Sequence, residues 1–210
     1  FADRGKYIAD SDFVDVPIDK LIDKKYLKFR SNKLDTKMKI PEVKPGSILQ
    51  KETNSYIYTN SLELPSTTHI SIVDEYGNAL SMTSTIESSF GSRLMTNGGF
   101  LLNNELTDFS FQKERKGKRV ANNIEPNKRP RSSMAPTIIF KNDKPLFIIG
   151  SPGGSNIIGY VVNSIIGLID WKMNVQQAAS IPHGINKFGT FYLEKNSKIA
   201  LLKNELEKKK

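Results

Sequence analysis

The stretch "TTHISIVDEYGNALSMTST", residues 67–85, decides the fold because it contains two strand-like runs around a turn. "THISIVD" and "ALSMTST" are rich in β-branched residues, and they flank "EYGN". A glycine-containing turn between two such runs is typical of a β-hairpin. The first run starts abruptly after Pro65 and Ser66, with two adjacent threonines. Thr67 is therefore either an ordinary strand start or a nucleophile that is exposed when the chain is cut, and both interpretations stay open here.

Two patterns on the C-terminal side of this hairpin predict further strands and a long helix. "PTIIF" and "PLFIIG" flank the turn "KNDK", and their nearly continuous apolar runs indicate strands covered on both faces. In "SNIIGYVVNSIIGLIDW", residues 155–171, isoleucine and valine recur at helical spacing, which indicates a packing face rather than a cofactor site. Strands followed by covering helices predict a layered α+β protein.

The segment from Lys37 to Ser66 has a different character. It contains Pro41, Pro45 and Gly46 with little periodicity, which is typical of a long surface connection. A structureless segment of this length is unusual inside one compact domain, so it calls for a functional explanation.

The charge of the chain points to partners only weakly. Lysine and arginine number 31 against 22 aspartates and glutamates, and the net charge of +9 favours polyanionic surfaces or acidic substrates. Much of the excess lies in "QKERKGKR" and "LLKNELEKKK", which we interpret as a solvated loop and a solvated helix end. No RNA-binding or zinc-finger pattern accompanies them, so the sequence predicts no nucleic-acid partner.

The residue types present also limit the chemistry. The absence of cysteine excludes disulfides, thiolate catalysis and cysteine-ligated metals. His69 and His183 belong to no ligand-spaced cluster, so we predict a structural role for each and no catalytic metal. Polar residues interrupt the longest apolar helix candidate, so we expect no membrane span. The first residues, "FADRGKYIADSDF", lack the pattern of a basic start followed by an apolar core that a signal peptide has, and we expect the chain to be part of something longer.

The glycine-rich stretch "GSPGGS", residues 150–155, lies between a predicted strand and a predicted helix. It has neither the Walker pattern nor the glycine spacing of a dinucleotide site. Two interpretations remain, a tight turn with a helix cap, or an oxyanion hole formed by the adjacent amides of Gly153 and Gly154.

Two polar motifs contain groups that suit the binding of an amino acid. In "NNELTDF", Glu105 and Asp108 lie three residues apart. A helical turn would bring both carboxylates to one side, and a loop could aim both at one ammonium group. In "RPRSSMAPT", Ser132 and Ser133 stand beside two arginines, a combination that suits a carboxylate. The alternatives are a solvated helix or loop for the first motif and a polar turn before a strand for the second.

Five motifs, in this order, resemble those of the γ-glutamyltranspeptidases and related N-terminal nucleophile hydrolases. They are "TTHISIVD", "TSTIESSFG", "LLNNELTDF", "NKRPRSSMAPT" and "GSPGGS", and the resemblance runs from near Phe1 to about Glu194. It implies a layered αββα sandwich built from two subunits of one precursor, which we expect to be incomplete in this chain.

The resemblance implies that the precursor cuts itself before Thr67. Residues 1–66 would then be the C-terminal end of the large subunit with its linker, and residues 67–210 the small catalytic subunit, shortened at its C-terminus. A threonine hydroxyl is a poor nucleophile, but the α-amino group that cleavage frees can accept its proton. The interpretation of Thr67 as a nucleophile would thereby also explain the long segment that precedes it.

The same resemblance implies a role for each candidate residue. Thr85 would hydrogen-bond and orient the Thr67 hydroxyl, and Gly153 and Gly154 would hold the oxyanion. Glu105 and Asp108 would bind the substrate's α-ammonium group, and Ser132 and Ser133 its α-carboxylate. Glu87 stands where many members of the family have an asparagine that helps to hold the α-amino group.

The implied reaction is γ-glutamyl transfer or hydrolysis from glutathione or a related γ-glutamyl amide, through a threonyl ester and without a cofactor. The implied partners are this substrate and the remainder of the large subunit, and the implied location is periplasmic or secreted. Glu87 also resembles the motif of poly-γ-glutamate depolymerases and cephalosporin acylases, which are alternative activities. A non-catalytic fragment or inactive relative that associates with a partner chain is the alternative from another class.

Overall fold

The computed structural model describes residues 1–35, 37–38, 40, 42–48, 56–59, 66–187 and 189–209. The chain forms two compact units, and both are made of separate stretches of sequence. The first unit comprises Phe1–Ser61, Asp108–Arg131 and Asn186–Lys210, and the second comprises Leu62–Thr107 and Ser132–Ile185. Half of the predicted connection from Lys37 to Ser66 lies outside the described residues. The division predicted at Thr67 is a covalent boundary, which a division by packing does not test.

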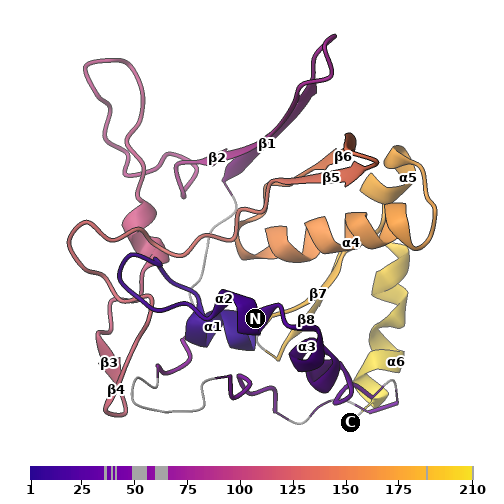
Figure 1. Cartoon of the computed structure of the whole chain (residues 1–210), viewed down its shortest axis with the longest axis horizontal. Coiled ribbons are helices and arrows are strands. Elements are labelled where there is room, and N and C mark those ends of the chain that lie inside the picture. The colour runs from indigo at the N-terminus through magenta and orange to yellow at the C-terminus, as the bar shows by residue number, and fades with distance from the viewer. Residues whose placement is uncertain are drawn as a thin grey trace. The chain divides into compact units, whose positions relative to one another are not determined.

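The predicted hairpin at residues 67–85 is confirmed in the second unit. Strand β1 (Thr67–Val73) pairs antiparallel with β2 (Ala79–Thr85), from Thr67 opposite Thr85 to Val73 opposite Ala79 (Figure 1). The Asp74 carboxylate closes the turn by accepting from the backbone N–H groups of Tyr76 and Asn78. The register therefore places the two threonines at the open end of the hairpin.

The second predicted hairpin is also present, but its expected burial is wrong. Strands β5 (Thr137–Lys141) and β6 (Lys144–Ile149) meet at Asn142 and Asp143, whose φ angles of 52° and 59° are those of a two-residue hairpin turn. Every residue of both strands is described, and none is buried. The apolar runs thus mark strand faces that could pack against another layer, and the described residues bury these faces only in part.

Serine hydroxyls join the two hairpins. Ser71 of β1 donates to the carbonyl oxygen of Ile148, and Ser81 of β2 donates to that of Ile149. The Ser81 hydroxyl also accepts from the backbone N–H of Thr137. The strand that begins at Thr67 is consequently fixed to the strand that leads into the glycine-rich loop.

The predicted long helix follows that loop. A 3-10 helix, η3 (Gly154–Asn156), leads directly into α4 (Ile157–Ile169), which buries Ile157, Val161 and Leu168. Helix α5 (Val175–Ala179) contacts α4 (Figure 1). It begins with a capping box between Asn174 and Gln177. The packing face predicted from the apolar spacing is confirmed at Ile157 and Val161, whereas Val162 and Ile169, which the same spacing includes, are exposed.

The first unit consists of short helices around a small core. The helices are α1 (Ala2–Tyr7), α2 (Ile18–Leu21), α3 (Lys24–Ser31), η4 (Lys198–Leu202) and α6 (Lys203–Lys208). Strands β3 (Glu114–Arg115) and β4 (Lys118–Arg119) form a small hairpin in this unit. Strand β8 (Phe191–Leu193) also belongs to it, whereas β7 (Gly184–Asn186) begins in the second unit and ends in the first. Val14, Tyr56 and Ala121 pack together in the core.

Residues 56–59 are bound to this first unit by backbone hydrogen bonds. Ile57 donates to the carbonyl oxygen of Arg119, and Thr59 donates to that of Gly5. The chain is therefore held seven residues before Ser66.

None of the described helices combines the length and the apolar character that crossing a bilayer requires.

Candidate active site

Thr67 is the first residue of β1 and lies opposite Thr85, the last residue of β2. The Thr85 hydroxyl donates to the carbonyl oxygen of Ser66 over 3.1 Å and accepts from the N–H of Glu87 over 3.0 Å. That carbonyl belongs to the peptide bond between Ser66 and Thr67. A donor at this oxygen polarises the bond that the resemblance implies is cut.

The predicted contact between Thr85 and the Thr67 hydroxyl stays a prediction. A hydroxyl has one hydrogen to donate, and in the uncut chain Thr85 directs its hydrogen to Ser66. Ser66 also pairs with the Ser89 hydroxyl over 3.1 Å. The residue before Thr67 is thus held from two sides, on its carbonyl and on its side chain.

Glu87, whose N–H donates to the Thr85 hydroxyl, occupies a strained and buried position. Its φ is 70°, a left-handed conformation that costs a residue other than glycine about 1–3 kcal/mol. The carboxylate oxygens of Glu87 and Glu105 lie within 4.8 Å of each other. The second unit therefore concentrates negative charge beside the strand end, where a cation would relieve the repulsion.

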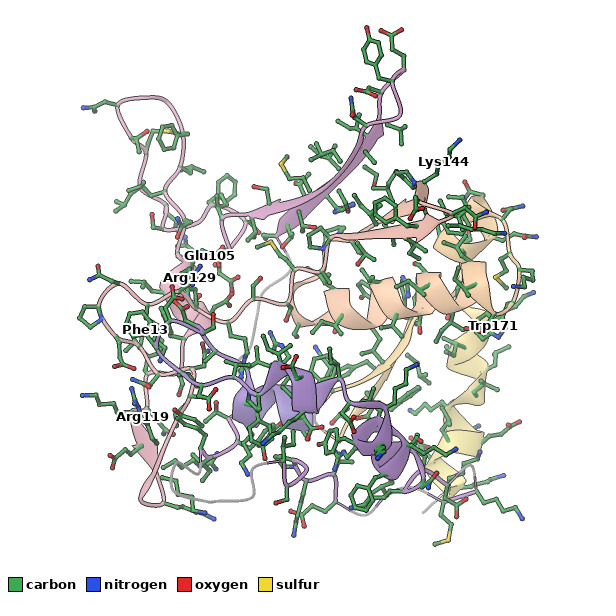
Figure 2. The ribbon with its side chains drawn as sticks, in the orientation of Figure 1. Phe13, Glu105, Arg119, Arg129, Lys144 and Trp171 are labelled. Carbon is green, nitrogen blue, oxygen red and sulfur yellow. The ribbon has the colours of Figure 1, made fainter. Side chains whose placement is uncertain are left out.

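Glu105 and Asp108 are the first and last residues of the 3-10 helix η2 (Glu105–Asp108), and Figure 2 labels Glu105. Of the helical turn and the loop that the sequence left open, the structure thus has a helical turn, in which residues three apart lie on the same side. Asp108 is buried within the first unit, where its carbonyl oxygen accepts from the Asn122 side chain over 2.7 Å. Binding of an ammonium group by these acids stays a prediction.

Ser132 and Ser133 have different surroundings. Ser133 is buried, whereas Ser132 is exposed and its hydroxyl accepts from the N–H of Met134 over 3.1 Å. This hydrogen bond is typical of a polar turn, which was the alternative interpretation of the motif. Such a turn also fixes the direction of the Ser132 hydroxyl. Binding of a carboxylate by the two serines stays a prediction.

The two neighbouring arginines bind groups of the first unit. Arg129, labelled in Figure 2, donates from Nε and Nη2 to the two carboxylate oxygens of Asp10. The Arg129 guanidinium therefore holds the pKa of the Asp10 carboxyl well below its usual range. Arg131 is buried and donates from Nη1 to the carbonyl oxygen of Arg4. Both arginines thus help to fix the segment that leads into Ser132.

The loop of Gly153 and Gly154 requires glycine. Gly153 has a φ of 138° and Gly154 one of 55°. A side chain at Gly153 would also lie 2.7 Å from the ring of Tyr160. The loop is the tight turn before a helix that the sequence indicated, and its use as an oxyanion hole stays a prediction.

His69 links the strand of Thr67 to the start of this loop. Its Nδ1 lies 2.8 Å from the Thr83 hydroxyl and its Nε2 lies 3.0 Å from the Ser71 hydroxyl. The ring fills the space beside Gly150, so a side chain added at that position would overlap the ring. Burial lowers the pKa of His69 below its usual value. The structural role predicted for this histidine is confirmed.

Solved structures define the class of protein. The fold of 99% of the chain is similar to that of the cephalosporin acylase from Bacillus halodurans, of which it covers 34%, with a TM-score of 0.78 and 21% identity. A threonine-to-alanine mutant of Helicobacter pylori γ-glutamyltranspeptidase matches 67% of the chain with a TM-score of 0.60 and 44% identity, and 80% of that solved chain is covered. The mixed α and β fold class is therefore confirmed.

The family follows from the sequence itself. The family model "Gamma-glutamyltranspeptidase" matches residues 1–209, and the chain belongs to this family. The glutathione hydrolase proenzyme of Bacillus subtilis strain 168 is 39% identical over 189 residues, which are 87% of this chain and 31% of that relative. The chain thus spans about a third of the length of the curated relatives that it matches.

Proposed function

We propose that the protein cuts itself before Thr67 and then transfers or hydrolyses γ-glutamyl groups. The observation that supports this most directly is the hydrogen bond from Thr85 to the carbonyl oxygen of Ser66. Negative charge develops on this oxygen when a nucleophile attacks its carbon, so the donor stabilises the attacked state.

In the proposed self-cleavage, the Thr67 oxygen attacks the carbonyl carbon of Ser66 and its proton passes to the departing Thr67 nitrogen. The C–N bond breaks, an ester joins Ser66 to the Thr67 oxygen, and water hydrolyses this ester. The products are a Ser66 carboxylate and a Thr67 residue with a free hydroxyl and a free α-amino group. Thr85 then has no peptide carbonyl to bind, and its hydroxyl is available for the new nucleophile.

In the proposed turnover, the Thr67 oxygen attacks the γ-carbonyl of the donor and the α-amino group accepts its proton. That proton goes to the leaving amine, and the γ-glutamyl group remains as an ester. Water or an acceptor amine then releases it. Gly153 and Gly154 would stabilise the oxyanion, and no cofactor takes part in any step.

The proposed substrate carries an α-amino acid head group. Glu87, Glu105 and Asp108 would bind its ammonium group, and Ser132 and Ser133 its carboxylate. The closeness of the Glu87 and Glu105 carboxylates supports the first assignment. Glutathione combines such a head group with a γ-amide, and the named relatives in Bacillus subtilis and Helicobacter pylori support this substrate class.

The proposal includes a layered αββα sandwich as the fold of the complete protein. The exposed apolar residues of both hairpins, among them Ile72, Leu80 and Phe140, support a further layer in the active protein. The large-subunit remainder of the precursor would supply this layer as a partner.

The deciding experiment is intact mass spectrometry of the natural full-length protein during incubation. We expect a break between Ser66 and Thr67 that appears with release of p-nitroaniline from γ-glutamyl-p-nitroanilide. Thr67→Ala should abolish both, and Thr67→Ser should keep both. A cleaved and active Thr67→Ala protein would contradict the proposal, and so would an uncut, inactive wild type.

A further inference from the structure

Asn122 joins two segments through its side-chain amide. Its Nδ2 donates to the carbonyl oxygen of Asp108 over 2.7 Å, and its Oδ1 accepts from the N–H of Arg131 over 2.9 Å. Its own carbonyl oxygen accepts from the N–H of Ser110 over 2.8 Å. The side chain is buried, with 1% of the residue exposed. A buried amide with both ends bonded has a fixed orientation, because any rotation would leave polar groups unpaired.

The adjacent Asn123 has equal burial and different contacts. It is 0% exposed, its Nδ2 donates to the carbonyl oxygen of Ile124, and its Oδ1 accepts from Lys128. These two contacts lie within its own loop, whereas those of Asn122 reach residues 14 positions before it and 9 positions after it. The chain therefore offers a matched pair of buried asparagines.

The two segments that Asn122 joins are those of the proposed head-group site. Asp108 is the proposed partner of the α-ammonium group. Arg131 is bonded directly to Ser132, the first of the two serines proposed for the α-carboxylate. The two charged groups of an α-amino acid are attached to one carbon atom. A site that binds both must hold its own groups at a fixed separation.

We propose that Asn122 is a positioning residue that sets the spacing between the ammonium-binding and the carboxylate-binding groups. The inference rests on the proposed function and concerns recognition of the α-amino acid head group. Asn122 acts through the Asp108 and Arg131 backbones and does not touch the substrate. Its removal should weaken selection for donors that carry both charged groups, and it should leave self-cleavage at Thr67 intact.

The test uses three donors and three variants of the natural full-length protein. γ-Glutamyl-p-nitroanilide carries both charged groups, glutaryl-p-nitroanilide lacks the ammonium, and 4-aminobutyryl-p-nitroanilide lacks the carboxylate. The variants are Asn122→Ala, Asn122→Asp and Asn123→Ala. Asn122→Asp keeps the size of the side chain and an acceptor for Arg131, but it loses the donor to Asp108, so it serves if Asn122→Ala fails to fold.

For the Asn122 variants we expect kcat/KM for the complete donor to fall by about 10- to 100-fold, mainly through KM. The values for the two single-group donors should change far less, so the selectivity ratio should fall. Asn123→Ala should lower the unfolding temperature and leave this ratio within about twofold, because its contacts lie in its own loop. An unchanged ratio in the Asn122 variants would overturn the inference, and so would an equal fall in Asn123→Ala.

Binding of L-glutamate separates this inference from the proposed function. L-Glutamate carries the head group and no scissile amide, and titration calorimetry measures its Kd without turnover. If the wild type cleaves no donor but binds L-glutamate, and the Asn122 variants bind it at least tenfold more weakly than Asn123→Ala, the proposed reaction fails and the inference stands. If the wild type does not bind L-glutamate, the inference fails.

Discussion

The hydroxyl of Thr85 lies 3.1 Å from the carbonyl oxygen of Ser66, and Thr85 pairs across the hairpin with Thr67. The strand register therefore aims a donor at the peptide bond that precedes the proposed nucleophile. This relationship is set by the pairing of two neighbouring strands.

Thr85→Val should slow self-cleavage by about 100- to 1,000-fold, because valine keeps the shape of threonine and removes the donor to Ser66. Thr85→Ser keeps the hydroxyl and should retain most of the rate. The fraction of cut chain against time, measured by intact mass, checks both variants. Cleavage of Thr85→Val at the wild-type rate would show that this hydrogen bond has no part in the reaction.

Gly153→Ala should destabilise the second unit and abolish turnover. The added methyl group meets the Tyr160 ring, and the φ of 138° is one that alanine rarely adopts. We expect a loss of about 2–4 kcal/mol in the free energy of unfolding. Gly77→Ala is the matched control, since it also changes a glycine of positive φ but has no atom within 4 Å of the added carbon. A loss no larger than that of the control would exclude the contact with Tyr160 as a cause.

Asp10→Asn should destabilise the protein strongly at neutral pH, and this effect should shrink progressively as the pH falls below about 4. Arg129 holds the pKa of Asp10 below its value in the unfolded chain. The stabilisation is therefore fully present above about pH 4, the pKa of an ordinary aspartate, and is lost as the pH falls further. Urea unfolding of the variant and the wild type at pH 7 and pH 3 measures the difference.

Asp12→Asn is the control for Asp10, because both carboxylates bind Arg129. The Asp12 side chain is 73% exposed and the Asp10 side chain is 1% exposed. Exposed ion pairs stabilise proteins by about 0–1 kcal/mol, so the control should change stability little at either pH. Equal effects of the two substitutions would refute the assigned importance of Asp10.

His69→Gln should make stability less dependent on pH between about 6.5 and 5. Burial lowers the pKa of His69 in the folded protein, so the unfolded chain binds the proton more readily. The wild type should consequently lose stability as the pH falls below about 6.5, the pKa of an ordinary histidine. Tm values of both proteins at pH 8 and pH 5.5 test this, and a parallel decrease in the two would contradict it.

Local patterns predicted the elements of the second unit well. The β-branched runs around a turn in residues 67–85 and the apolar spacing in residues 155–171 depend on neighbours along the chain, which a sequence displays directly. The burial of β5 and β6 was predicted wrongly. An apolar run indicates that a strand can be buried, but it does not identify the residues that would bury it.

Contacts between residues that are distant in the sequence could not be predicted from local patterns. Arg129 pairs with Asp10 across 119 positions, and nothing in "NKRPRSS" indicates that partner. Asn122 stands in "VANNIEP", where the two asparagines are indistinguishable until the fold shows that one of them joins Asp108 to Arg131. The motifs identified candidate residues, but the hydrogen bonds that orient them depend on packing.

The first unit combines residues from both sides of Thr67, with Phe1–Ser61 packed together with Asp108–Arg131 and Asn186–Lys210. A nick at Thr67 would therefore turn the bonds from Ile57 to Arg119 and from Arg129 to Asp10 into bonds between two polypeptides. The nicked protein should migrate as one particle in gel filtration and as two bands after denaturation. Its halves would separate only by unfolding the unit that they share, so activation would free a new chain end without dispersing the subunits.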